Sequence, residues 1–251
     1  MSTTTISAPD PAPAPQQPIN HFGRIIGVFF SPKATFGSIA QQPSWILPVA
    51  LAMVVGAVVA FALNQKVDWR DIASKRIEAS PRAAQMTPEQ KEQQLAMSAK
   101  ISPAVAWGIG LCWPILQAVI VGAAMLFAFN LVGGAGTRFS NAMGIVAHAY
   151  VPWLLYSLLF VLVLYLKEPG TLDLENPVAT NVGTFLPEKT PAAVMSLGKS
   201  IDIFSIWTLF LISMGFTAVN PKKLKGSALG IALGVWAVYV LVKVGLAWIF
   251  S

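Results

Sequence analysis

Four polar side chains lie inside long apolar stretches, and they are the residues best placed to do chemistry: Gln117, Asn130, His148 and Lys243. Polar groups are costly in lipid, so such residues either hydrogen-bond between helices, extend to the interface, or line a path for ions or protons. Lys243 lies about 10 Å from the end of its stretch, so it can reach the membrane surface. A transporter would normally add acidic residues within these stretches, and the sequence has none there.

Catalytic and metal-binding motifs are missing from the sequence. His21 and His148 are the two histidines, Cys112 is the one cysteine, and no HExxH, CxxC, Walker or GxSxG pattern occurs. The glycine run at 133–136 looks like a phosphate-binding loop only in composition, because no lysine follows at the required spacing, and we interpret it as a turn. The sequence therefore predicts a protein that is not an enzyme and needs no cofactor or metal.

The composition indicates a membrane protein. Of 251 residues, 55% are hydrophobic and only 11% are charged, whereas a soluble protein carries about 25% charged residues. The net charge is +6, and the basic residues border the apolar stretches. Anionic lipid headgroups are therefore the expected partner, rather than nucleic acid.

Five apolar blocks predict an all-α fold, a bundle of five transmembrane helices. Each block can cross a ~30 Å hydrocarbon core, and none alternates as a strand would. The fourth block is the shortest. The predicted helices cover about 46–63, 104–132, 142–166, 203–219 and 227–250.

The segments outside these helices have their own patterns. Residues 1–19 are rich in Pro and Ala and predict a disordered tail, which leaves 20–251 as the membrane domain. Residues 19–42 predict two short amphipathic helices in the interface, or alternatively a packing segment under the bundle, with Arg24 off the apolar stripe. Residues 64–103 predict two short surface helices, the second opened by a capping box at Thr87.

Small residues at a spacing of four predict two surfaces where helices approach closely. The first set, in the last block, is Gly226, Gly230 and Gly234, and the second, in the first block, is Ala52, Gly56 and Ala60. The partner of the first set is either a helix of the same bundle or a second copy of the chain.

Basic residues bear on the orientation in the membrane. Counting Lys and Arg alone slightly favours a cytoplasmic location for the two long loops, which also hold nine acids. Lys222, Lys223 and Lys225, however, form a tight cluster without acids in the shortest loop. We therefore predict a multi-pass protein of the cell membrane with a cytoplasmic N-terminus.

The order of several short motifs resembles the Yip family, in its prokaryotic branch. The segment Phe29-Phe30-Ser31-Pro32-Lys33-Ala34-Thr35-Phe36 precedes Pro43-Ser44-Trp45, followed by Gly133-Gly134, Thr137-Arg138-Phe139 and Ala149-Tyr150-Val151-Pro152. The resemblance implies five spans, a cytosolic N-terminus and no catalytic residues. The eukaryotic branch also implies binding of small GTPases, but the N-terminal acidic-aromatic segment associated with it is absent here, so we do not expect that activity.

Two functional hypotheses remain. The first is a non-enzymatic scaffold, assembly or membrane-organising component that acts through helix and lipid contacts, with other membrane proteins or itself as partners. The second is a small-solute transporter or channel subunit lined by the four polar residues. The two differ in whether those four side chains converge on one cavity.

Overall fold

The computed structural model describes residues 19–249, except 79, 169–172, 175 and 188, and all regular structure in that part is helical. The predicted tail at 1–19 falls almost entirely outside the described residues. Four helical segments are long and apolar enough to cross a membrane: α3 (Ile46–Lys66), α5 (Pro88–Leu131), α6 with α7 (Phe139–Leu166) and α11 (Ala228–Ile249). These segments confirm an all-α polytopic membrane protein. A shorter apolar helix, α9 (Ile203–Val219), has 17 residues and the predicted boundaries.

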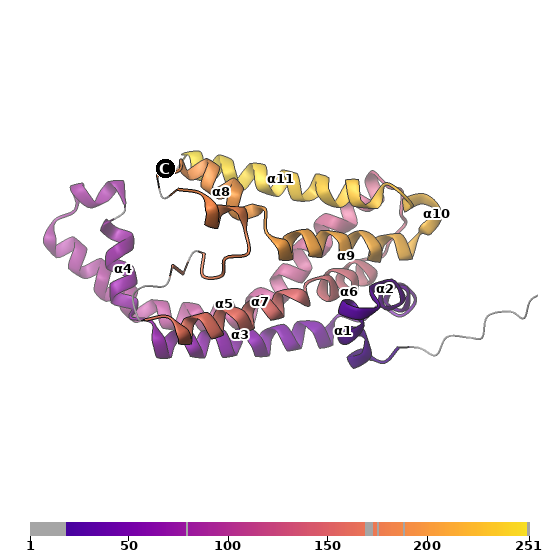
Figure 1. Cartoon of the computed structure of the whole chain (residues 1–251), viewed down its shortest axis with the longest axis horizontal. Helices are drawn as coiled ribbons and strands as arrows, with labels where there is room; N and C mark the ends of the chain where they lie inside the picture. The colour runs from indigo at the N-terminus through magenta and orange to yellow at the C-terminus, as the bar shows by residue number, and fades with distance from the viewer. Residues whose placement is uncertain (1–18, 79, 169–172, 175, 188, 250–251) are drawn as a thin grey trace, which may run out of the picture.

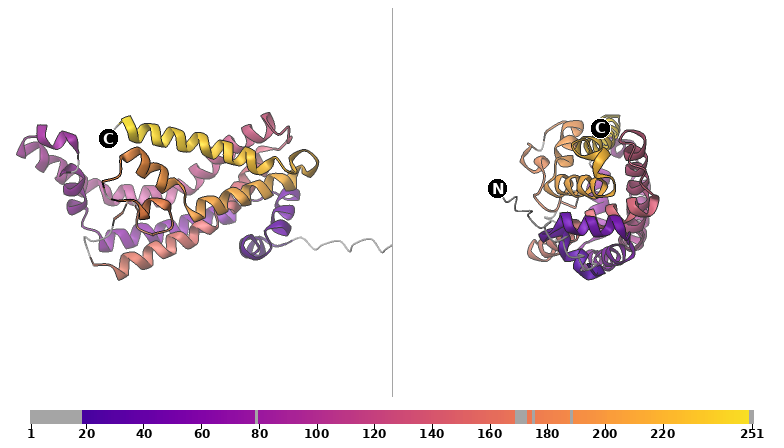
Figure 2. Two further views of the ribbon diagram at one scale, coloured as in Figure 1. Left: turned by 45° about the horizontal axis from the view of Figure 1, so that its top comes forward. Right: turned by 90° about the vertical axis from the view of Figure 1, so that its right-hand side faces the viewer.

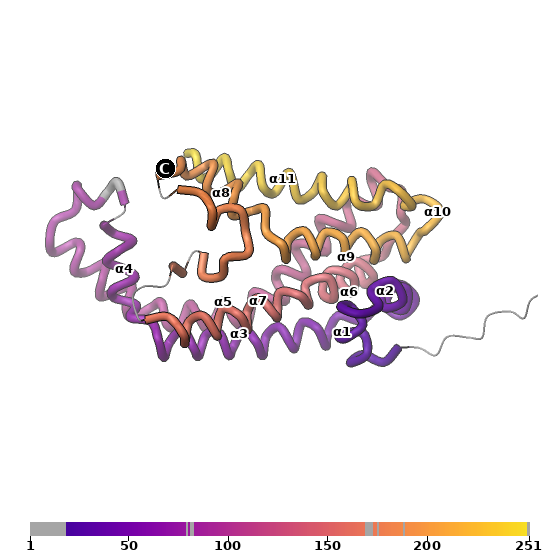
Figure 3. The backbone as a smooth tube through the Cα atoms, viewed as in Figure 1, coloured from indigo at the N-terminus to yellow at the C-terminus, as the bar shows by residue number. Residues whose placement is uncertain are grey.

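The long helices form an elongated bundle, and the short helices lie at its two ends (Figures 1 and 3). One end holds α1 (His21–Phe30), α2 (Pro32–Gln41) and α10 (Pro221–Leu224). The other end holds α4 (Trp69–Glu78), α8 (Ala192–Ser200) and the last turns of α11. The described chain therefore starts and finishes at opposite ends. Two 3-10 turns complete the structure, η1 (Pro81–Gln85) and η2 (Val182–Phe185).

The second transmembrane helix differs from the prediction. Thr87 caps α5 through the predicted capping box, but α5 then continues for 44 residues through Pro103 and Pro114. The polar segment after Thr87 is therefore not a separate short helix. A proline inside a helix costs about 3 kcal/mol, and the strong helix formers Glu, Gln, Lys and Ala in this segment offset that cost.

The third apolar block is divided, where one helix was predicted. α6 (Phe139–Ala149) ends before Tyr150, and α7 (Pro152–Leu166) begins two residues later. Pro152 causes the break, because it has no N–H and its ring clashes with the carbonyl four residues earlier. Asp202 caps the start of α9, since its carboxylate accepts hydrogen bonds from the backbone N–H groups of Phe204 (2.8 Å) and Ser205 (3.3 Å).

The hydrophobic core lies at the end that holds α1 and α2. Every residue of α6 from Asn141 to Ala149 is buried. The helices around α6 are α2, α5 and α9, and the rings of Phe129 and Phe216 stack there with centroids 4.0 Å apart. Packing is thus dense at this end, and the helices diverge toward the other end (Figure 2).

Candidate functional site

A buried arginine fixes the two N-terminal helices to the bundle. Arg24 is 2% exposed, and its guanidinium donates hydrogen bonds to the Gln42 carbonyl (2.8 Å), the Ser44 hydroxyl (2.9 Å) and the Ser38 hydroxyl (3.0 Å). Burial lowers the pKa of this guanidinium. No salt bridge to Arg24 occurs among the described residues. The sequence predicted only that Arg24 lies off the apolar stripe, so it did not reveal this anchor.

The opposite face of α1 is apolar and uncovered. Phe22 is 74% exposed, Ile26 61% and Phe30 84%, and their spacing of four places them along one side of the helix. Ile25 and Phe29, which are also apolar residues of α1, instead pack against the core. We call α1 and α2 together the interfacial unit, since it joins a buried anchor to a row of exposed apolar side chains.

A cavity of about 670 Å³ lies in the loosely packed half of the bundle. Its walls come from α5, α7, α8, α9 and α11. Six of the described residues that line it are aromatic: Trp113, Tyr150, Trp153, Tyr156, Trp236 and Tyr239. We call it the lysine cavity, because Lys199 and Lys243 lie in its wall. The sequence did not predict it, since its residues come from elements far apart in the chain.

The four polar residues predicted within the apolar stretches do not all line one cavity. Gln117 and Lys243 line the lysine cavity. Asn130 instead donates from Nδ2 to the Thr137 carbonyl (2.9 Å) and accepts at Oδ1 from the Thr137 N–H (2.8 Å), which closes the glycine turn after α5. The Nδ1 of buried His148 bonds to the Gly144 carbonyl (2.8 Å) one turn earlier. These four side chains therefore do not form the single polar path that the transporter hypothesis needs.

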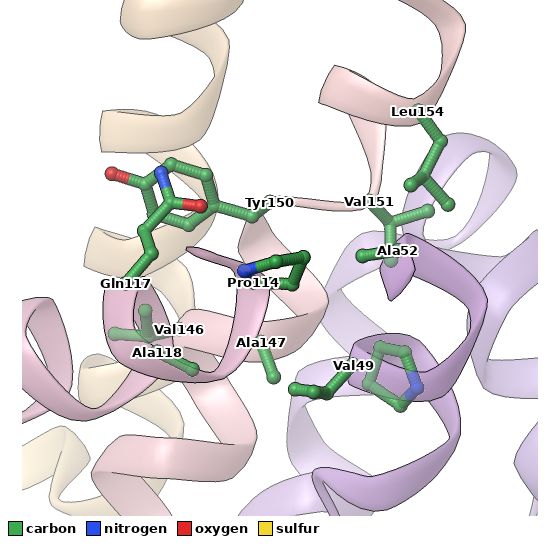
Figure 4. Close-up of a pocket in the computed structure, with 11 residues that line it drawn as sticks. Val49, Ala52, Pro114, Gln117, Ala118, Val146, Ala147, Tyr150, Val151 and Leu154 are labelled. Carbon is green, nitrogen blue, oxygen red and sulfur yellow. The ribbon is translucent and has the colours of Figure 1, made fainter. Parts of the chain in front are cut away.

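A second, much smaller cavity borders the first. It measures about 30 Å³, enough for about one water molecule. Figure 4 shows the Gln117 amide next to the Tyr150 ring, with Pro114 of the same helix beside them and Val49 and Ala52 across the space. Gln117 and Tyr150 line both cavities, so they form the partition between them.

The small residues of α3 lie against α5. Gly56 faces Gly110 so closely that a Cβ on Gly56 would overlap the Gly110 carbonyl, and a Cβ on Gly110 would lie 2.5 Å from the Gly56 oxygen. Ala52 lies near Pro114, and Ala60 is buried. The sequence held a signal for the α5 side of this contact, because Ala106, Gly110 and Pro114 also repeat at a spacing of four.

The glycines at the start of α11 lie differently. Gly226 has φ 91° and belongs to the turn before the helix, so the expectation that all three glycines lie on one helical face is wrong. At Gly226, Gly230 and Gly234, no described atom lies within 4 Å of where a Cβ would be. No neighbouring helix of the described chain covers this face, and packing across two copies stays a prediction.

The fold and these sites define a multi-pass α-helical membrane protein. The Yip1 domain family matches residues 26–247, and the chain belongs to this family. The family is generally one of non-enzymatic membrane proteins. No curated protein and no solved structure matches the chain. The resemblance found in the sequence is thereby confirmed, whereas the prokaryotic branch and the five spans stay predictions.

Proposed function

We propose that this protein is a non-enzymatic membrane-organising component of the cell membrane, and that it acts by inserting the interfacial unit into one leaflet. The observation that carries the proposal is the exposed row Phe22, Ile26 and Phe30, fixed by the buried anchor Arg24. An amphipathic helix held in the interface displaces lipid headgroups and so changes the packing of its leaflet. Contacts with other membrane proteins or a second copy would use the remaining exposed apolar faces.

Charge supports a cytoplasmic location for the interfacial unit. Lys222 and Lys223 belong to α10, at the same end of the bundle as α1 and α2. The hydrogen bonds from Asn141 to the Ala40 carbonyl (2.9 Å) and from Asn220 to the Ala135 carbonyl (3.1 Å) join the turns of that end. A basic, acid-poor end favours the cytoplasmic leaflet.

The double variant Phe22→Ser/Phe30→Ser tests this proposal. The full chain is reconstituted into vesicles, and vesicle diameter is measured by electron cryomicroscopy at fixed protein-to-lipid ratio. We expect the wild type to shift the distribution to smaller vesicles and the variant to lose at least about half of that shift, because each lost ring forfeits roughly 2 kcal/mol of apolar burial.

Phe185→Ser is the matched control. Phe185 is 81% exposed but belongs to η2, at a distance from the interfacial unit. This variant should reshape vesicles as the wild type does, and the melting temperature of all variants in detergent should stay equal. If the Phe22→Ser/Phe30→Ser protein reshaped vesicles as well as the wild type, the interfacial unit would not carry the function.

A further inference from the structure

The lining of the lysine cavity changes from polar to apolar along its length. Lys199, Ser200, Asp202 and Lys243 lie at one end, where α8 meets α9 and α11. Ile212 lies ten residues into α9 from Asp202, about 15 Å further along the helix axis. Met125, Leu209 and Val235 line that deeper part. The cavity is therefore amphipathic, with its polar end near the membrane surface.

The polar end offers a cationic hydrogen-bond donor. Lys243 Nζ donates to the Ser200 hydroxyl at 3.1 Å, and Lys199 also lines this end of the cavity. An ammonium group has three donor hydrogens, so the Ser200 bond leaves two. Asp202 is the one acidic side chain among the described wall residues, and its oxygens already accept from Thr180 and from the start of α9. This end is thus suited to an anion.

The cavity also has a lateral side exposed to lipid. Trp113 and Ile120 of α5 and Tyr239 of α11 belong to its lining and are all exposed. Toward the polar end, α5 and α11 diverge (Figure 2). A lipid molecule could therefore enter from the bilayer without crossing the bundle.

We propose that the lysine cavity binds one anionic glycerophospholipid. Its phosphate lies against the Lys243 ammonium, and an acyl chain lies along Met125, Leu209 and Ile212. An apolar wall of this length excludes a free phosphate as the preferred occupant, because the burial of an acyl chain supplies about 0.8 kcal/mol per CH₂. The inference goes beyond the proposed function, since the polar end of the cavity and the interfacial unit lie at opposite ends of the bundle (Figure 1) and can be tested separately.

Lys243→Gln tests the headgroup contact. The full chain is purified in mild detergent, titrated with phosphatidylglycerol or phosphatidylcholine, and bound lipid is counted by native mass spectrometry. We expect the wild type to retain one phosphatidylglycerol at least tenfold more tightly than phosphatidylcholine. Lys243→Gln should lose about tenfold of that affinity, whereas Lys167→Gln, an exposed lysine at the end of α7, should lose none.

Ala124→Trp tests the acyl-chain contact, because Ala124 lines the apolar part of the cavity and a larger ring would fill it. This variant should weaken phosphatidylglycerol binding at least fivefold. Equal binding of phosphatidylcholine, or wild-type affinity in the Lys243→Gln protein, would overturn the headgroup assignment. Thermal protection by inorganic phosphate equal to that by phosphatidylglycerol would overturn the lipid as occupant. Circular dichroism of lipid-free protein verifies that each variant is folded.

Discussion

Gly56→Ala is expected to destabilise the protein by about 3 kcal/mol, although alanine is normally the better helix residue by about 1 kcal/mol. The added methyl would overlap the Gly110 carbonyl oxygen, which is backbone and cannot rotate away. α3 and α5 would have to separate, and the contacts of Ala52 and Ala60 along the same face would weaken with them. Chemical unfolding in detergent, followed by circular dichroism, measures the change.

Gly230→Ala is the matched control for this experiment. It makes the same substitution in a transmembrane helix, at a position with no described atom within 4 Å of the new methyl. We expect Gly230→Ala to be at least as stable as the wild type, with a gain of up to about 1 kcal/mol from the better helix residue. Equal stability of the Gly56→Ala and Gly230→Ala proteins would mean that α3 and α5 do not cross at Gly110.

The second large effect is expected at the buried anchor. Arg24→Met should weaken docking of the interfacial unit by about 2 kcal/mol, because three charge-assisted hydrogen bonds are lost while an apolar side chain of similar length fills the space. Arg24→Lys should restore little, since one ammonium cannot reproduce the fork that binds Gln42, Ser38 and Ser44 together. Limited proteolysis within residues 21–41, with unfolding in detergent, measures both variants.

Arg76→Met gives the comparison, because Arg76 is an exposed arginine of α4. It should change neither the proteolysis rate nor the stability. Arg24 stabilises the docking of the interfacial unit only if its hydrogen bonds outweigh the cost of burying a guanidinium. An Arg24→Met protein as stable and as protease-resistant as the wild type would show the reverse balance.

Local sequence signals predicted the helices well. The boundaries of α9 and the capping box at Thr87 follow from side chains within a few residues of each helix end. Pro152 is a signal for a helix break that the sequence contains, but the long apolar stretch around it led to the prediction of one continuous helix. The sequence predicted a short surface helix after Thr87, whereas α5 continues from Pro88 through Pro103 to Leu131.

Features that depend on tertiary contacts were missed. Arginine is rarely buried, so nothing near Arg24 indicated that three acceptors 14 to 20 residues later would surround it. The lysine cavity likewise combines helices whose order in space the sequence does not reveal. At the start of α11 the sequence showed a glycine pattern, but no helix of the described chain packs there. A pattern of small residues alone does not tell whether a helix or lipid covers that face.

We predict that the chain crosses the membrane five times, with α9 as the shortest crossing, so that the interfacial unit and the polar end of the lysine cavity lie at opposite membrane surfaces. Single cysteines at Lys33, Lys223, Arg76 and Lys189, introduced after Cys112→Ala, test it with an impermeant maleimide on sealed vesicles of known orientation. We predict that positions 76 and 189 react from the outer surface, while 33 and 223 react only after permeabilisation. Labelling of positions 189 and 223 from the same side would show that α9 does not cross the membrane, and would contradict the account.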